Sequence, residues 1–356
     1  MTKDIKTILS VLIGLFPALF FSQEIKQMTA NEVAELALQN HYQLKVSAQN
    51  INIAKQQTDI TKLQKLPSVV ASTTQFYLGN VVAIDKDFSN STTIPMPHYG
   101  STYGVQATQL IFKGGLVNKS IEMAGLREQL SELDLEKNKQ DVKFLVISNY
   151  LDVYKIINQQ SVFNNNKKLA LQRLKNINDF YKQGMITRNE VIRGELALKN
   201  LDQGILTLAN NKKILNYNLN IALGLPEDTE IIPVENLGNK ESGIGMDYYL
   251  NLAHDSNPQL KSAQTNIGVA DKNIEIIKTD RMPTLSGFGG YSLQRPITAR
   301  NPVLDMYSSG WQGGISLSYN IDNLYKTKEK VKLGEMQKNQ AKDALTLTHH
   351  NIEMNV

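Results

Sequence analysis

Few side chains in this sequence are arranged to do chemistry. There is no cysteine, which excludes disulfides, thiol catalysis and cysteine-ligated metals. The five histidines show no ligand spacing with one another or with carboxylates, and two of them are direct neighbours, which point to different faces of a helix. We therefore expect no catalytic residue, no cofactor and no metal site. The histidines are His41, His98, His254, His349 and His350.

Two other patterns could suggest an enzyme but are better explained by structure. The glycine-rich run at residues 287–290 is not followed by Gly-Lys-Ser or Gly-Lys-Thr, so strand glycines or a bulge explain it better than a phosphate loop. Glu132 and Asp134 form a carboxylate pair that should lie on a solvated helix face, and no Gly-x-Ser-x-Gly motif occurs. The sequence thus predicts that the protein is not an enzyme.

The charge distribution argues against nucleic-acid binding. The net charge is only +4 over 356 residues, and the basic residues are spread along helices rather than gathered into a stripe. The N-terminus has a different signature, because Lys3 and Lys6 precede an apolar stretch over residues 8–21. This layout predicts a secretory signal peptide at 1–23, with an uncleaved anchor as the alternative. No later stretch reaches about 18 apolar residues, so membrane insertion would have to use strands.

The chain contains an internal repeat. Residues 36–67 align without gaps on residues 252–283 at a shift of 216, with 11 identities among 32 positions. Each copy predicts a short helix, a polar break and a helix of roughly 20 residues, which Pro67 or Pro283 ends. Thr29 followed by Glu32 predicts a capping box at the first short helix.

Two predicted strands follow each of these prolines, at 68–78 and 102–112 and then at 284–293 and 311–321. They are about 10 to 12 residues long with aromatic residues near their ends, as expected of tilted strands in a bilayer. The last strand alternates between an apolar row that we assign to lipid (Trp311, Ile315, Leu317, Tyr319, Ile321) and a polar row that we assign to a lumen (Gln312, Ser316, Ser318, Asn320). A soluble sandwich strand would alternate similarly, and a slip of one residue would invert the assignment.

Residues 114–223 predict a long helical hairpin. No proline interrupts 114–183, and apolar residues recur at steps of three and four, which favours coiled-coil packing. Gly184 suits a left-handed helix cap, and Thr187 with Glu190 predicts a second capping box that opens the return helix. Between the two helices, the local sequence at 184–190 indicates a turn, which is the tip of the hairpin. A polar linker at 227–245 leads into the second copy. The tip comprises Gly184, Met185, Ile186, Thr187, Arg188, Asn189 and Glu190.

Together these motifs resemble the TolC-type outer-membrane efflux protein family, over residue 27 to the end. Each motif is weak alone, but their order and partial duplication are specific. They are Asn257-Pro258-Gln259-Leu260 at the start of the second long repeat helix, the helix-ending Pro67 and Pro283, Gln-Leu-Ile-Phe-Lys-Gly-Gly at 109–115, the hairpin tip at 181–190, and Ala-Leu-Gly-Leu-Pro at 222–226.

The resemblance implies an α+β membrane protein with two structural repeats. Each protomer would lend four strands to a trimeric 12-stranded transmembrane β-barrel, above a long α-helical coiled-coil barrel. The implied function is a passive exit duct of a tripartite efflux or type I secretion system, in the outer membrane and periplasm of a Gram-negative bacterium. The implied partners are a homotrimer of the chain, a periplasmic membrane-fusion adaptor that docks on the tip, an inner-membrane RND or ABC pump, and outer-membrane lipid. Independently, four strands leave two open edges, which lipid forbids unless neighbouring chains close them.

Two departures from the family pattern limit what can be carried over. His41-Tyr42 stand where the family favours Asn-Pro, which weakens one turn. The chain also stops at Val356, within the second long helix, so we expect the second repeat at 246–356 to be incomplete and carry over no gate residues. Two alternatives stay open: a periplasmic coiled-coil adaptor with a soluble β-domain, and a non-functional truncated fragment of the channel.

Overall fold

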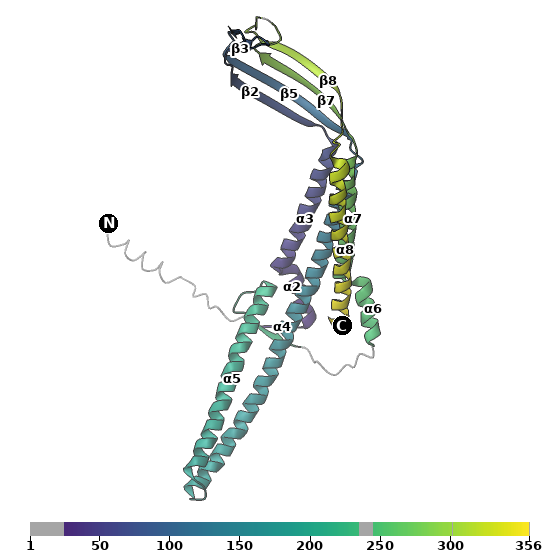
Figure 1. The fold of residues 1–356 in the computed structure, drawn as a ribbon. Coiled ribbons are helices and arrows are strands. Elements are labelled where there is room, and N and C mark those ends of the chain that lie inside the picture. Colours follow the sequence, from purple (N-terminus) through teal and green to yellow (C-terminus); the bar gives the residue numbers. More distant parts are fainter. Residues whose placement is uncertain (1–24, 235–244, 301, 356) are drawn as a thin grey trace, which may run out of the picture. The chain divides into compact units, whose positions relative to one another are not determined.

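The computed structural model describes residues 25–234, 245–300 and 302–355. The chain divides into two compact units, one made of residues 1–46 and 138–243, the other of 47–137 and 244–356. Helices α3 (Tyr42–Lys62) and α4 (Leu116–Lys182) contribute residues to both units (Figure 1). The expected signal peptide at 1–23 lies outside the described residues.

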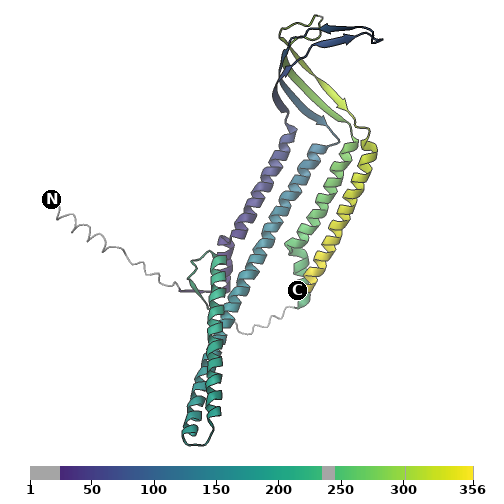
Figure 2. The same cartoon turned by 60° about the vertical axis from the view of Figure 1, so that its left-hand side comes forward.

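The second unit contains a four-stranded antiparallel sheet in the order β2-β5-β7-β8. Each repeat supplies two neighbouring strands, and β2 and β8 are the edges. The helices α3, α4, α7 and α8 lie side by side next to the sheet in both views (Figures 1 and 2). The bounds are β2 Ser68–Tyr77, β5 Tyr99–Phe112, β7 Thr284–Arg295, β8 Ser308–Ser318, α7 Pro258–Lys278 and α8 Asn323–Asn355.

The internal repeat is visible in the bounds of the elements. Helix α6 (Met246–Ser256), α7, the 3₁₀ turn η2 (Thr279–Arg281) and β7 each begin 216 residues after α2 (Ala30–Asn40), α3, η1 (Leu63–Lys65) and β2. The predicted capping box is confirmed, because Thr29 accepts a hydrogen bond from Glu32 N and the Glu32 carboxylate accepts one from Thr29 N. At the start of α7 the Asn257 side chain instead accepts from Gln259 N, and Pro258 occupies the first helical position.

The first unit holds the larger buried core. Helix α2 packs on α5 (Arg188–Leu223), which returns along α4. A parallel pair of short strands, β1 (Ile25–Met28) and β6 (Glu230–Pro233), lies next to them. The most completely buried side chains are Val33, Ala37, Val146, Tyr150, Val153, Leu219, Asn220, Leu223, Thr229 and Ile231.

Polar side chains attach β1 and β6 to this core. Asn220 donates to the carbonyls of Thr229 at 2.7 Å and Glu227 at 3.1 Å, while Asn216 accepts from Ile231 N at 2.8 Å. Tyr150 donates its hydroxyl to the carbonyl of Met28 at 3.0 Å. Buried backbone groups that no ladder satisfies thus find side-chain partners.

Two sequence expectations need correction, those for the linker at 227–245 and for the last strand. The segment 227–245 contains strand β6, and its residues 235–244 lie outside the described residues. Between β2 and β5, the chain also forms a small hairpin of β3 (Val81–Ile84) and β4 (Ser91–Ile94). Strand β8 covers 308–318 instead of 311–321, because Ser308 pairs with Gln294 while the carbonyls of Asn320 and Ile321 already accept the first turn bonds leading into α8.

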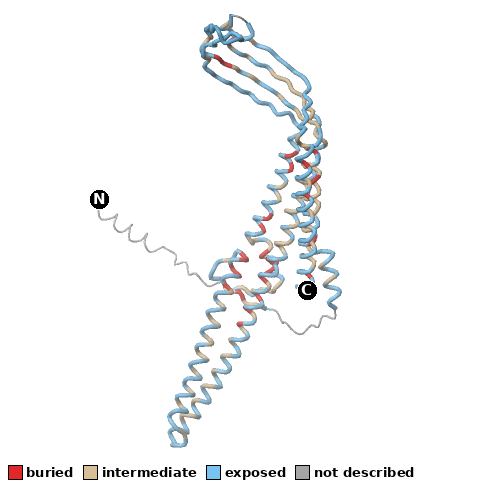
Figure 3. Tube along the Cα trace, in the orientation of Figure 1, coloured by how far each residue is buried: buried red, intermediate tan, exposed pale blue. Residues whose placement is uncertain are grey.

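Much of the apolar surface of this chain stays exposed. Buried residues occur along the helices nearest the sheet and around α2, whereas the edge strands β2 and β8 are almost entirely exposed and β7 is mostly half-buried (Figure 3). Residues 157–215, the outer part of the hairpin, contain no buried side chain. In the described ranges, no helix is both long and apolar enough to cross a membrane.

Candidate functional site

The register of the sheet aligns apolar side chains on one of its faces. Trp311 lies opposite Tyr291, which lies opposite Val105, which in turn lies opposite Ala71. Two steps along the strand, Gly313, Gly289, Ala107 and Val69 form the next row. Because directly paired residues of neighbouring strands share a face, these rows form one surface that carries the predicted Ile315 and Leu317 as well.

The other face carries small and polar side chains on β8, and apolar Phe288, Leu110 and Val70 on the other strands. Gln312 pairs through Gly290 with Gln106, and Ser316 pairs through Ser286 with Leu110. Ser318 pairs with Thr284. The predicted polar row on β8 thus continues across three strands as the face of one sheet.

Two parts of the predicted rows lie beyond the strand. Tyr319, Asn320 and Ile321 follow the end of β8 and enter the turn before α8, so strand alternation does not assign them to a face. The remaining apolar residues are strongly exposed, with Trp311 at 83% and Ile315 at 71% of their full accessible area. Such a surface can only be stable if lipid or protein covers it.

Glycine allows the strands of the sheet to approach closely. At Gly290 an added Cβ would lie 2.9 Å from the carbonyl oxygen of Val105, which belongs to the neighbouring backbone. At Gly314 the added atom would lie 3.2 Å from Cζ of Phe288. The glycine run at 287–290 lies within β7, as the sequence predicted.

The hairpin tip is a turn between α4 and α5 with a well-defined backbone. Gly184 has φ = +77°, and hydrogen bonds from Gly184 N to Tyr181 O and from Met185 N to Phe180 O close a Schellman motif. Thr187 is the first cap residue of α5, as predicted, but its side chain makes no cap hydrogen bond. The predicted capping box is therefore wrong, because Glu190 instead pairs with Arg193 at 3.1 Å.

Most of the tip is exposed. Met185 keeps 68% of its accessible area, Ile186 is half-buried, and Gly184, Thr187, Arg188, Asn189 and Glu190 are exposed. Behind the tip, the two helices interlock where Gly204 faces the ring of Phe163 and Lys167 pairs with Asp202 at 2.7 Å. The tip thus presents a small exposed surface with both apolar and polar side chains, at the end of two packed helices.

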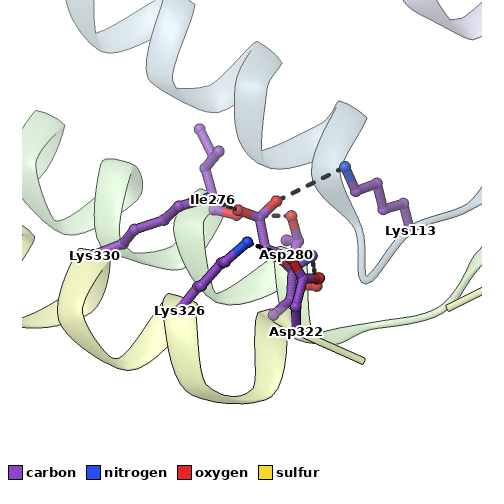
Figure 4. A network of polar contacts seen from close by, with 8 residues as sticks. Lys113, Ile276, Asp280, Asp322, Lys326 and Lys330 are labelled. Atoms are coloured by element: carbon purple, nitrogen blue, oxygen red, sulfur yellow. Dashed lines mark hydrogen bonds and ion pairs between the residues drawn. The ribbon is translucent and has the colours of Figure 1, made fainter. Parts of the chain in front are cut away.

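A polar network ties the strands to the helices of the same unit (Figure 4). Asp280, just before β7, pairs with Lys330 of α8 at 2.9 Å and lies 3.8 Å from Lys113 after β5. Asn323 donates to the backbone carbonyl of Asp280 at 3.0 Å. The network thus joins three strand–helix junctions, and nothing in the sequence pointed to it. The two repeat prolines lie directly before strands. Pro283 precedes β7, and Pro67 precedes β2.

At the opposite end of β7, an ion pair closes the connection to β8. Arg295 donates Nε to Oδ1 of Asp305 at 2.7 Å and a second nitrogen to Oδ2 at 2.9 Å. This bidentate contact holds the pKa of the Asp305 carboxyl below its usual range. Ser101 of β5 lies 3.4 Å from the Tyr307 hydroxyl.

Two of the histidines meet in space. Nδ1 of His254 in α6 lies 3.3 Å from Nδ1 of His349 in α8, although 95 residues separate them. Sequence spacing could not reveal this pair. Within the described ranges, no group of three or more metal-binding side chains could hold an ion.

The chain is similar in fold to solved structures of membrane proteins, one of which is an outer-membrane channel. The CmeC outer membrane channel of Campylobacter jejuni matches with a TM-score of 0.70 at 16% identity, over 90% of this chain and 67% of CmeC. The outer membrane protein VceC of Vibrio cholerae matches with a TM-score of 0.69 at 11% identity, over 90% and 75%. A membrane protein of Pseudomonas aeruginosa matches with a TM-score of 0.70 at 16% identity, over 90% and 74%. The comparison with curated proteins found no match.

The chain therefore shares with these proteins a fold made of sheet strands and long helices. Residues 249–355 match the family model described as "Outer membrane efflux protein". That match and the shared fold agree with the resemblance seen in the sequence.

Proposed function

We propose that this protein is a subunit of a passive efflux channel in the outer membrane, with its helices extending into the periplasm. The observation that carries the proposal is the sheet: β8 has one small, polar face and one apolar, exposed face, and β2 and β8 are edges. The match of residues 249–355 to the outer membrane efflux protein model supports a channel rather than an enzyme. The sheet edges would pair with those of two further copies, which closes a 12-stranded barrel around the polar face.

Two adjacent residues of β8 test which face meets lipid. Ile315→Arg places a charge on the apolar face, where it should cost about 2–4 kcal/mol near the bilayer midplane and reduce insertion. Ser316→Arg places the same charge on the polar face, where insertion should persist and the ion selectivity of the pore should move toward anions. The measurements are heat-modifiable gel mobility of the outer-membrane fraction and conductance in planar bilayers.

The matched pair makes the proposal falsifiable. Equal behaviour of the two variants, or release of the unmodified chain as a soluble periplasmic protein, would contradict a lipid-facing apolar surface. If Ile315→Arg inserts into the membrane and Ser316→Arg does not, the face of Ser316 meets lipid and the face of Ile315 meets the lumen.

We further propose that the tip at 184–190 docks a periplasmic membrane-fusion adaptor of a tripartite efflux or type I secretion system that an RND or ABC pump energises. The support is an exposed Met185 on a rigid turn. A photo-crosslinking amino acid at position 185 should capture a co-expressed adaptor, whereas the same probe at Leu169, which is equally exposed on α4, should not. Capture from Leu169 alone would place the contact away from the tip.

A further inference from the structure

Helix α6 is weakly attached to the rest of its unit. Its described residues include no buried side chain, and its first cap residue, Gly245, offers no side chain to the helix. Its counterpart in the first repeat, α2, has a capping box and buries Val33, Ala34 and Ala37. The repeat therefore preserves the helix but not the packing that holds it.

The closest polar contact between α6 and α8 is the histidine pair. The two rings lie 5.3 Å apart between centroids with a tilt of 31°, and their Nδ1 atoms face one another at 3.3 Å. Position 254 corresponds to Leu38 at the repeat shift, so an imidazole replaces an apolar side chain in the second copy.

We propose that His254 and His349 are the two protein ligands of a site for a divalent transition-metal ion, with Zn²⁺ as the probe, that fixes α6 to α8. Zinc binds imidazole nitrogen at roughly 2.0–2.1 Å, so two such ligands at a tetrahedral angle stand roughly 3.3 Å apart. The observed separation of the two Nδ1 atoms is 3.3 Å. An ion therefore enters between the rings with little movement of either helix.

A metal-bound imidazole uses the ring nitrogen that carries no proton. Both imidazoles bind as neutral ligands through Nδ1, which leaves their protons on Nε2. Glu353 Oε1 lies 3.8 Å from Nε2 of His254, so a carboxylate approaches the ring nitrogen that would not bind the ion. A ring that starts as imidazolium releases its extra proton to solvent, and water completes the coordination because both side chains are accessible.

The test is zinc titration of the full chain, purified in detergent without a histidine tag and treated with a chelator. Calorimetry should detect one Zn²⁺ per chain, with affinity at least about tenfold weaker for His254→Ala and for His349→Ala. His350→Ala is the matched control, since it removes an exposed histidine from the same helix, and it should bind like the unmodified chain. Glu353→Gln should weaken binding by about tenfold, because it keeps the shape but removes the charge behind His254.

Spectroscopy separates this site from adventitious surface binding. Bound Cu²⁺ should show electron paramagnetic resonance coupling to two imidazole nitrogens, and one of them should disappear in each single variant. Unchanged affinity in His254→Ala, an equal loss in His350→Ala, or no saturable binding at all would overturn the proposal. Circular dichroism of each variant confirms that the helices are intact, and none of these readouts depends on channel activity.

Discussion

Asp280 and Lys330 form an ion pair of 2.9 Å that joins the end of α7 to α8, although 50 residues separate them in the chain. Because Lys113 also approaches Asp280, one carboxylate lies among three of the connections between sheet and helices. It thus positions the strands relative to the helices that carry them.

Removing this carboxylate should have a small effect that depends on salt. Asp280→Asn should lower the melting temperature slightly at low ionic strength, corresponding to about 1 kcal/mol or less, since the Lys330 side chain is half exposed. The difference from the unmodified chain should shrink in high salt. Asp59→Asn breaks only the local pair with Lys62 within α3 and serves as the control. An effect of Asp280→Asn no larger than the control would show that the network does not stabilise the junction.

A methyl group at Gly290 should disturb the sheet more than one at Gly310. The added Cβ at Gly290 would lie 2.9 Å from the backbone oxygen of Val105, which cannot rotate away, whereas nothing lies within 4 Å at Gly310. We expect Gly290→Ala to cost about 1–3 kcal/mol and Gly310→Ala to be close to neutral. Thermal unfolding followed by circular dichroism measures both, and equal effects would refute the close approach of β5 and β7.

Two glycines of the long hairpin should respond to alanine with opposite signs. Gly184 has φ = +77° and caps α4, so Gly184→Ala should destabilise the hairpin by about 1 kcal/mol. Gly125 lies inside α4 with open space around it, so Gly125→Ala should stabilise the helix by about 0.5–1 kcal/mol. Melting temperatures that move in the same direction would contradict this assignment of the tip.

The contact between α4 and α7 should respond to pH in a defined window. The Lys272 hydrogen bond lowers the pKa of the Glu122 carboxyl, and the same contact raises the pKa of Lys272. A lowered acid pKa stabilises the fold above the unfolded value of about 4.3, and this gain is lost as the pH falls through the folded pKa. The raised lysine pKa contributes below about 10.4 and is lost at higher pH.

The difference in melting temperature between the unmodified chain and Glu122→Gln should therefore be largest near neutral pH and vanish near pH 3. Glu132→Gln removes an equal charge from an exposed position of the same helix and corrects for net charge. A difference that persists at pH 3 would mean that the side chain acts through packing rather than through its charge.

Local features were predictable because their causes lie within a few residues. The capping box at Thr29, the stop before Pro67 and Pro283, and the left-handed Gly184 each depend on neighbours in the chain. The capping box predicted at Thr187 does not form, which shows the limit of such reasoning. The Glu190 carboxylate pairs with Arg193 instead of with the backbone of Thr187. The shift at β8 has a similar cause, because cross-strand pairing with Gln294 decides where the strand begins.

The sequence by itself determined the repeat, the long hairpin and the two-faced strand, because periodicity and caps are properties of contiguous residues. The tertiary structure alone decided which strands pair, how β1 and β6 meet, and that Asp280 joins three junctions. It also placed His254 against His349. Contacts of this kind depend on the register and packing of segments far apart in the chain, and no local pattern encodes them.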